Sequence, residues 1–320
     1  MSDPFDRPGV GARPPRQEPL PEEHPKPAED DPEAPARVRE LLASASYRQA
    51  DSDLEFLSGE ETRGVRLQID YLKAELELRR YGVEHTIVVF GSTRISEPGA
   101  AARHVRELND AATAAPGDRD LAHQLAVAER LLDKSRYYDV ARELGRLVGN
   151  CCDGAGPSSR VLLMTGGGPG IMEAANRGAY DVGAPSIGLN IALPREQFPN
   201  PYITADLCFR FHYFALRKLH FLLRARALVA FPGGYGTLDE VFETLTLVQT
   251  RTIPPVPVVL VGESYWRRVL DIDFLVEEGV IEQEDRALFW YAETAEDIWR
   301  SILDWHERRG TPLLTPVAQP

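Results

Sequence analysis

What the chain has little of excludes several classes of protein. Its 320 residues include only three cysteines, two of them adjacent, which fits neither a disulfide framework nor a zinc-binding pattern. Sparse cysteines of this kind indicate free thiols in a reducing compartment. No run approaches the roughly 20 apolar residues that a transmembrane helix needs, and the N-terminus lacks the apolar core of a secretory signal. We therefore expect a cytoplasmic protein with no membrane partner.

Positively charged residues are also fewer than negatively charged ones. Lys and Arg number 36 against 49 Asp and Glu, which gives a net charge of −13. This balance argues against a nucleic-acid partner, because such binding depends on neutralising phosphates. A small anionic ligand is still possible, since it needs only a local positive site.

The N-terminal part differs in composition from the rest. Residues 1–36 are rich in Pro, Asp and Glu, and we expect a disordered tail because so little apolar surface can be buried. Residues 37–82 indicate a helical extension, whose last helix would begin at a capping box of Ser58 and Glu61 and end at Gly82. Its apolar residues fall on one stripe, which predicts packing on the core or on a partner chain: Val65, Ile69, Leu72 and Leu76.

Short apolar runs alternate with helical segments over residues 83–310, which we interpret as one domain followed by a tail over 311–320. The runs predict buried strands, near residues 85–90, 160–165, 186–191, 227–231 and 256–262. Helices separate them, including an insert at about 98–134. This alternation predicts an α/β fold with a parallel sheet covered by helices on both faces.

Three of the predicted strands lead straight into glycines: Gly91-Ser92, the run from Gly166 to Gly170, and Gly233-Gly234. Ligands of parallel sheets bind at the carboxyl ends of strands, so these turns should share one edge. The run "TGGGPG" holds more glycines than a turn needs, which favours contact with a phosphate. It matches neither the usual dinucleotide motif nor a Walker loop.

The stretch "PGGYGTLDE", residues 232–240, supports two interpretations. Backbone N–H groups from Gly233 to Thr237 can form an anion-binding nest at the start of a helix. The same letters from Thr237 to Glu240 also form a capping box, in which Glu240 would serve only to cap the helix. Spacing alone favours neither interpretation.

A cationic pair, Arg217-Lys218, lies one strand before this motif in an otherwise apolar helix. Charges in such a segment are costly unless they pair or face a site. The isolated His212 and His220 are more typical of packing or surface residues. No His, Asp or Glu set has metal-ligand spacing, so we expect no metal site.

Taken together, these motifs resemble the LOG family of cytokinin riboside 5′-monophosphate phosphoribohydrolases, formerly described as possible lysine decarboxylases. The family hallmark P-G-G-x-G-T-x-x-E is met over residues 232–240, and its Arg-Lys pair by Arg217-Lys218. "TGGGPGIMEAANRGA" resembles its glycine-rich turn, and "FGSTR" resembles its first nucleotide loop. The resemblance covers residues 84–270. "SIGLNIALPREQFPNPYI" and "LTLVQT" resemble the longer bacterial members described as AMP nucleosidases.

This resemblance implies a Rossmann-like doubly wound sheet and hydrolysis of the N-glycosidic bond of a nucleoside 5′-monophosphate, with no cofactor. The substrate would be AMP, an N6-modified cytokinin riboside monophosphate, or both, and the products a free base and ribose 5-phosphate. Arg217 and Glu240 match the family's catalytic pair. The candidate substrate contacts are Gly91, Ser92, Gly167, Gly168, Asn190, Lys218, Gly233, Gly234, Tyr235, Gly236, Thr237 and Thr246.

Two other functions remain open at this point. A non-catalytic carrier of a nucleotide or cofactor could use the same scaffold. A pyridoxal-phosphate-dependent decarboxylase would need a Schiff-base lysine, for which Lys218 is the candidate near the motifs. The apolar helices also predict a homodimer or higher homo-oligomer.

Overall fold

The computed structural model describes residues 24–151, 161–194 and 198–313. Much of the predicted N-terminal tail, Cys152 and the end of the C-terminal tail therefore lie outside the described residues. The chain divides into two compact units between Arg63 and Gly64. Each unit is described separately below.

The described part of the first unit contains two α-helices joined by short 3₁₀ segments. Their bounds are α1 Ala34–Ala43 and α2 Leu54–Ser58, and the next helix, α3, spans Arg63–Arg80. The capping box predicted at Ser58 and Glu61 is wrong. Ser58 is the last residue of α2, and its hydroxyl donates to the Leu54 carbonyl at 2.6 Å.

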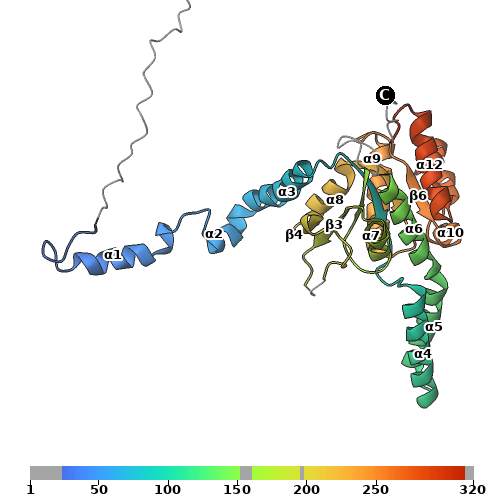
Figure 1. Ribbon diagram of the computed structural model, residues 1–320, viewed down its shortest axis with the longest axis horizontal. Helices are drawn as coiled ribbons and strands as arrows, with labels where there is room; N and C mark the ends of the chain where they lie inside the picture. The colour runs from blue at the N-terminus through green and yellow to red at the C-terminus, as the bar shows by residue number, and fades with distance from the viewer. Residues whose placement is uncertain (1–23, 152–160, 195–197, 314–320) are drawn as a thin grey trace, which may run out of the picture. The chain divides into compact units, whose positions relative to one another are not determined.

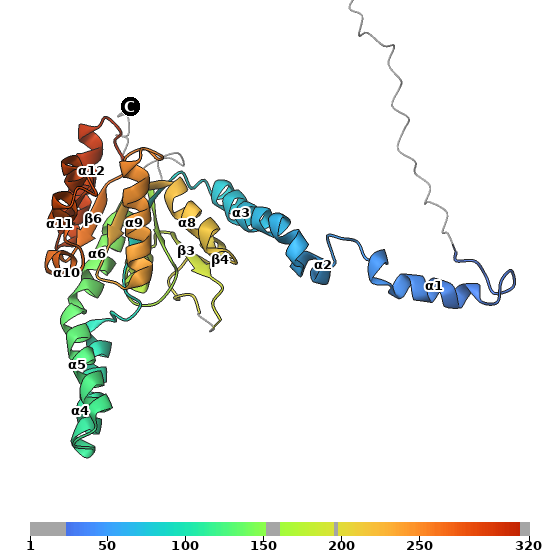
Figure 2. The same ribbon diagram turned by 180° about the vertical axis from the view of Figure 1, so that it is seen from behind.

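The second unit is built on a seven-stranded sheet in the order β4-β3-β2-β1-β5-β6-β7 (Figures 1 and 2). All neighbouring strands run parallel, which confirms the predicted sheet. The strands are β1 His85–Phe90, β2 Val161–Thr165, β3 Ser186–Ile191, β4 Cys208–Phe211, β5 Ala225–Ala230, β6 Val258–Val261 and β7 Phe289–Ala292. Sequence analysis missed β4 and β7. Both are short edge strands with partly exposed residues, so neither forms a continuous aliphatic run.

Helices cover both faces of this sheet, as predicted. The alternating side chains of β1 divide between two cores, with Ile87 and Val89 on one face and Val88 and Phe90 on the other. The first core is completed by α6, α7 and α12, and the second by α3, α8, α9 and α10. These helices span α6 Arg136–Asn150, α7 Ile171–Asp181, α8 Phe214–Leu223, α9 Tyr235–Gln249, α10 Glu263–Val269 and α12 Ala295–Arg308, with a short α11 Ile272–Glu277 between the last two.

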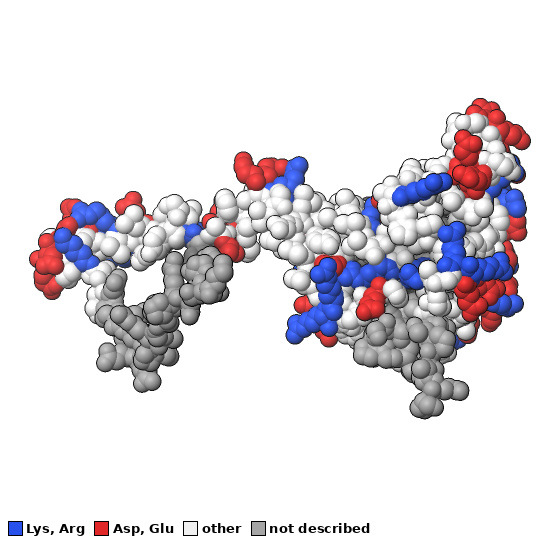
Figure 3. All heavy atoms as spheres, turned by 90° about the horizontal axis from the view of Figure 1, so that it is seen from above, with Lys and Arg blue, Asp and Glu red and all other residues white. Residues whose placement is uncertain are grey.

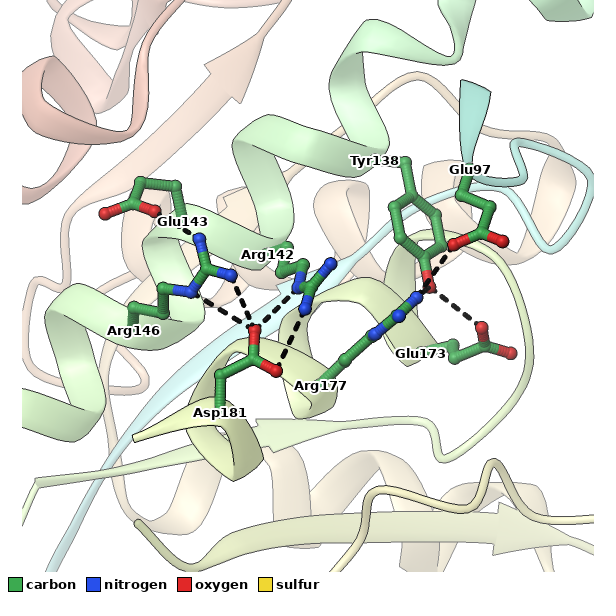
Figure 4. Close-up of polar contacts among 8 residues, drawn as sticks. All are labelled: Glu97, Tyr138, Arg142, Glu143, Arg146, Glu173, Arg177 and Asp181. Atoms are coloured by element: carbon green, nitrogen blue, oxygen red, sulfur yellow. Dashed lines mark hydrogen bonds and ion pairs between the residues drawn. The ribbon is translucent and has the colours of Figure 1, made fainter. Parts of the chain in front are cut away.

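The predicted insert is a pair of helices, α4 Pro98–Ala114 and α5 Arg119–Lys134. They lie side by side and project away from the sheet (Figures 1 and 2). Figure 4 shows the polar contacts near the base of this pair, where Arg177 of α7 donates to Glu97, the residue before α4, at 2.8 Å. Tyr138 of α6 donates to Glu173 of α7 at 2.9 Å. The contact between Arg177 and Glu97 therefore joins the start of the insert to α7, which is itself bonded to α6.

The stripe predicted on α3 does not pack on the core of its own chain. Its members are exposed to solvent by 48%, 52%, 37% and 57% (Val65, Ile69, Leu72 and Leu76). The buried face of α3 instead carries Ala74, Glu75 and Leu78, and Glu75 pairs with Arg224. The ion pair, together with two apolar contacts, decides which face turns inward. Packing of the stripe on a partner chain stays a prediction.

The surface is mixed in charge. On the face shown in Figure 3, the described Lys and Arg side chains lie among Asp and Glu side chains. None of the helices in the described ranges combines the length and apolar character needed to cross a membrane.

A close contact between α6 and α7 gives a stability prediction. A Cβ at Gly178 of α7 would lie 1.8 Å from the Arg142 carbonyl oxygen of α6. We expect Gly178→Ala to lower the free energy of unfolding by about 1–3 kcal/mol, because the packed helices must separate. Urea unfolding followed by circular dichroism measures this.

Gly64→Ala is the matched control. Gly64 lies in α3 with open space where its Cβ would be, so alanine should be neutral or stabilise by up to about 1 kcal/mol through helix propensity. Equal effects of the two substitutions would contradict the packing argument.

Candidate active site

The three glycine turns meet at one edge of the sheet. They follow β2, β1 and β5, which are neighbours, and this confirms the predicted shared edge. Ser92 joins the turns through its backbone, since its N–H donates to the Pro232 carbonyl at 3.0 Å and its carbonyl accepts from the Ile171 N–H at 3.2 Å. The direction of winding reverses between β1 and β5. Doubly wound sheets bind ligands at such a point.

The first glycine turn, after β2, depends on glycine at two positions. Gly167 and Gly170 have φ angles of 72° and 73°, which L side chains rarely adopt. A Cβ at Gly167 would lie 2.0 Å from the Asn190 Oδ1 atom, and one at Gly170 would lie 2.4 Å from the Ser92 carbonyl oxygen. The candidate contacts Gly167 and Asn190 are therefore neighbours, and the backbone here is closely confined.

A buried hydrogen-bond network holds this turn, and sequence analysis missed it. The Gly167 N–H donates to the Thr165 hydroxyl at 3.0 Å, and that hydroxyl donates to the Asn176 side chain at 2.7 Å. The Asn200 amide donates to the Gly168 carbonyl at 3.1 Å. Buried polar groups are usually paired in this way. The available signal was Asn176, a polar residue among the small apolar residues of a predicted helix.

The second glycine turn resolves the question about Glu240. Helix α9 begins at Tyr235 with Gly234 as its N-cap, and no side chain caps it. Thr237 is thus already inside the helix, and Glu240 lies a further turn along it. The capping-box interpretation of Glu240 is therefore wrong. The Thr237 side chain packs against Gly233 instead, where an added Cβ would lie 2.1 Å from the Thr237 Oγ1 atom.

This second turn is open toward solvent on one side and held from behind on the other. Gly234 and Gly236 have free space where a Cβ would be, and Tyr235 is 92% exposed. From the inner side, the Tyr265 hydroxyl of α10 donates to the Gly233 carbonyl. Sequence analysis gave no indication of Tyr265, which lies beyond the next strand. A small anion could approach the exposed side of this turn.

Arg217 and Glu240 face each other between the two glycine turns. The Arg217 Nη2 atom lies 3.6 Å from the Glu240 Oε1 atom, and the two side chains are 15% and 6% exposed. The guanidinium carbon lies 5.4 Å from the ring centroids of both Phe214 and Phe221, a distance typical of cation–π contacts. A Cβ on Gly166 would lie 4.0 Å from Arg217 Nη2. The predicted pair is thus assembled beside the first glycine turn.

Burial shifts the pKa values of both members of this pair. It raises the pKa of Glu240 from 4.5 to about 7, although the nearby Arg217 and Lys218 act to lower it. Burial also lowers the pKa of Arg217, while Glu240 acts to raise it. A buried carboxyl with a pKa near neutrality is typical of a group that takes part in catalysis.

Lys218 is a paired cation. Its Nζ atom lies 3.0 Å from Asp239 Oδ1 and 3.2 Å from Glu243 Oε2. Burial acts to lower the pKa of Lys218, but hydrogen bonds to these two carboxylates raise it overall. Substrate contact by Lys218 stays a prediction, and it would have to share the ammonium with Asp239 and Glu243.

Thr246 is the candidate that lies apart from the others. It is exposed in the second half of α9, about 18 Å along the helix axis from Gly234, and its hydroxyl donates to the Phe242 carbonyl at 2.7 Å.

Within the described ranges, no group of three His, Cys, Asp or Glu side chains could hold a metal ion.

The chain is similar to a described protein family and to several of its curated members. The model of a family described as "Possible lysine decarboxylase" matches residues 172–302. Over 188 residues the chain is 32% identical to cytokinin riboside 5′-monophosphate phosphoribohydrolase LOG3 of Arabidopsis thaliana, covering 56% of this chain and 82% of that protein. It is also 32% identical over 169 residues to phosphoribohydrolase LOG of Oryza sativa subsp. japonica, covering 52% and 65%.

Solved structures show weaker similarity. The Moco carrier protein from Chlamydomonas reinhardtii is 17% identical with a TM-score of 0.40, covering 70% of this chain and 99% of that one. The structural-genomics target TM1055 is 21% identical with a TM-score of 0.41, covering 68% and 98%. Scores this low carry no argument about function.

The raised pKa of Glu240 gives a stability prediction. Between pH 4.5 and about 7 the folded chain holds a proton that the unfolded chain releases, so this group's contribution to stability falls as pH rises. Glu240→Gln removes that dependence. The free energy of unfolding of the variant minus that of wild type should therefore rise by about 1–3 kcal/mol between pH 5 and pH 8.

Urea unfolding of both proteins across this pH range measures the difference. Because only the change with pH is compared, any constant effect of losing the carboxylate beside Arg217 cancels. Parallel pH curves for the two proteins would show that the carboxyl titrates at its ordinary value.

Proposed function

Because this chain belongs to the LOG family of cytokinin riboside 5′-monophosphate phosphoribohydrolases, we propose that it hydrolyses the N-glycosidic bond of nucleoside 5′-monophosphates. The observation that carries the proposal is the buried Arg217–Glu240 pair at 3.6 Å, beside a glycine turn at a helix start. The substrates are AMP, N6-modified cytokinin riboside monophosphates, or both. The products are the free base and ribose 5-phosphate.

The 5′-phosphate of the substrate would bind at the start of α9. Backbone N–H groups at a helix N-terminus lack partners within the helix, and the helix dipole favours an anion there. The open side of Gly234 and Gly236 leaves room for the phosphate. Glu240 lies on the same helix, so a phosphate bound at this turn would bring the ribose toward its carboxylate.

Glu240 would act on the sugar. Breaking the bond between ribose and base builds positive charge at C1′, as in other glycoside hydrolyses. An ionised carboxylate stabilises this charge and can accept a proton from the attacking water. The water oxygen bonds to C1′ and its proton passes to Glu240, which later releases it to solvent, while the base leaves with the electron pair of the broken bond and takes up a proton from solvent.

Arg217 would act on the leaving base or on the phosphate. Its guanidinium stays charged and is a poor proton donor, so its contribution is electrostatic. It is already desolvated between Phe214 and Phe221, and its Nε atom has no hydrogen-bond partner in the described structure. A buried donor without a partner is costly, and a substrate oxygen or nitrogen would satisfy it.

The decarboxylase alternative fits the residues poorly. A Schiff-base lysine must react as a free amine, whereas the Lys218 ammonium is held by two carboxylates that raise its pKa. The carrier alternative does not explain why a buried glutamate should face Arg217, because a carrier needs no group that titrates near neutral pH.

The test is direct. Chromatography of reactions with AMP, GMP, CMP and isopentenyl-AMP should reveal a free base and ribose 5-phosphate from at least one of them. Arg217→Ala and Glu240→Gln should each lower kcat by about 10²–10³-fold, typical for loss of one preorganised group. With wild type, kcat/KM should rise with pH through an apparent pKa of about 7 as Glu240 ionises.

Glu307→Gln, at an exposed site on α12, is the matched control and should retain wild-type rates. Absence of base release from every nucleotide would refute the proposal. If Glu240→Gln keeps the acidic limb of the pH profile, Glu240 is not the group whose ionisation raises kcat/KM.

We also propose that the protein self-associates through the helices around this site. The two helices that carry Arg217 and Glu240, α8 and α9, also carry exposed apolar side chains: Phe214, Leu219, Leu223 and Phe242. A second copy would cover this surface, since clustered apolar groups at a surface indicate an interface. Light scattering after size exclusion should give a dimer or larger, and Leu223→Glu should lower the mass toward a monomer. A monomeric wild type would contradict self-association.

A further inference from the structure

Helix α8 carries Arg217 in its first turn but has no side-chain cap of its own. Its N-cap residue is Tyr213, which makes no capping bond. The first N–H groups of a helix have no partners within the helix, and a Ser, Thr, Asp or Asn at the N-cap usually satisfies them. Here an acceptor from another helix instead holds the two residues that lead into α8. Asp70 of α3 accepts from the His212 N–H at 3.2 and 3.1 Å and from the Tyr213 N–H at 3.1 Å.

Helix α3 holds α8 at two further points. The buried ring of His220 lies with its Nε2 atom 3.2 Å from the Tyr71 carbonyl oxygen. At the other end of α8, Arg224 donates to the two carboxylate oxygens of Glu75 at 2.9 and 3.0 Å. Arg217 therefore lies on a helix that is fixed near its start, middle and end by one neighbour.

The position of Arg217 depends strongly on its backbone. Its N–H donates to the Tyr213 carbonyl at 3.2 Å, which ties it to the residue that Asp70 caps. Its guanidinium lies 3.6 Å from Glu240, longer than an ordinary hydrogen bond, and its Nε atom is unpaired in the described structure. Side-chain bonds alone therefore hold the guanidinium weakly.

We propose that Asp70 is a positioning residue for Arg217, because it fixes the first turn of α8 and with it the distance from the guanidinium to the Glu240 carboxylate. The inference rests on the function proposed above for this pair. It makes α3, which precedes the sheet in the chain, part of the machinery of the site. Sequence analysis had interpreted α3 only as a packing helix.

The charges around Glu240 predict in which direction its pKa should change if α8 is loosened. Arg217 and Lys218, which lower the pKa of Glu240, both lie on α8, whereas Asp239 and Glu243, which raise it, lie on α9 with Glu240 itself. Loosening α8 would move the cations and leave the acids in place. The pKa of Glu240 should then rise, which a purely stabilising role for Asp70 would not produce.

The experiment compares Asp70→Ala and Asp70→Asn with Glu77→Ala. Glu77 is an exposed acid on the same helix, so its removal controls for lost charge on α3. Asp70→Ala should lower kcat by about 10- to 100-fold with a smaller effect on KM, since a shift of about 1 Å in a catalytic group can cost that much. The acidic limb of the pH profile should move to higher pH. Asp70→Asn, which keeps one acceptor oxygen, should fall between wild type and alanine, and Glu77→Ala should match wild type.

A second measurement does not depend on turnover. The titration of Glu240 can be followed by carboxyl ¹³C NMR of glutamate-labelled protein, with the signal assigned by its loss in Glu240→Gln. Its midpoint should move to higher pH in the Asp70 variants. If the wild type releases no base, the proposed function fails, and this titration alone decides the role of Asp70.

A lower melting temperature with unchanged kcat, pH profile and Glu240 titration would overturn the proposal, since Asp70 would then only stabilise the fold. If Asp70→Ala does not fold, the same readouts on Asp70→Asn decide the outcome.

Discussion

The site depends on holding a carboxylate and a guanidinium together out of water without letting them form an ideal ion pair. Two buried opposite charges normally close into a short, bidentate contact that offsets their desolvation. Here the separation is 3.6 Å, and the Arg217 Nε atom stays unpaired. Much of the surrounding architecture keeps this pair buried and apart. Aromatic rings flank the cation, glycine turns hold the backbone, and neighbouring helices on the same face of the sheet, α3 and α10, hold the two supporting elements.

The glycine turns contribute through close approach as well as through conformational freedom. At Gly167 the neighbouring Asn190 leaves no space for a Cβ, and at Gly170 the Ser92 carbonyl does the same. Ser92 bonds in turn to both flanking turns. The three loops therefore behave as one hydrogen-bonded edge, and a substrate held by one of them is positioned relative to the other two. Preorganised dipoles of this kind are effective because they need not rearrange during reaction.

Much of this arrangement was readable in the sequence, and the failures have physical causes. The parallel sheet and the shared edge of the glycine turns followed from strand patterns, whereas the pairing of Arg217 with Glu240 followed from the resemblance to the LOG family. Spacing could not decide whether Glu240 is a cap, because a helix start can shift by a turn, and α9 begins at Tyr235. The apolar stripe on α3 does not face the core of its own chain, because the opposite face carries Glu75, which pairs with Arg224. Supporting residues such as Asn176 and Tyr265 act through contacts far along the chain, which a local pattern cannot reveal.

The N-cap residue of α8, Tyr213, is held by a residue 143 positions earlier in the chain, and this also bears on how the protein folds. A helix that carries its own cap can form its first turn locally, but this one must wait until a large loop has closed. Contacts of such long sequence separation form slowly because the entropy of closure must be met first. During synthesis, α3 emerges from the ribosome well before the helix that it will cap. The fold thus links completion of the turn that supports Arg217 to docking of the earliest helix of the same unit, so that a competent site indicates a chain in which α3 has already docked.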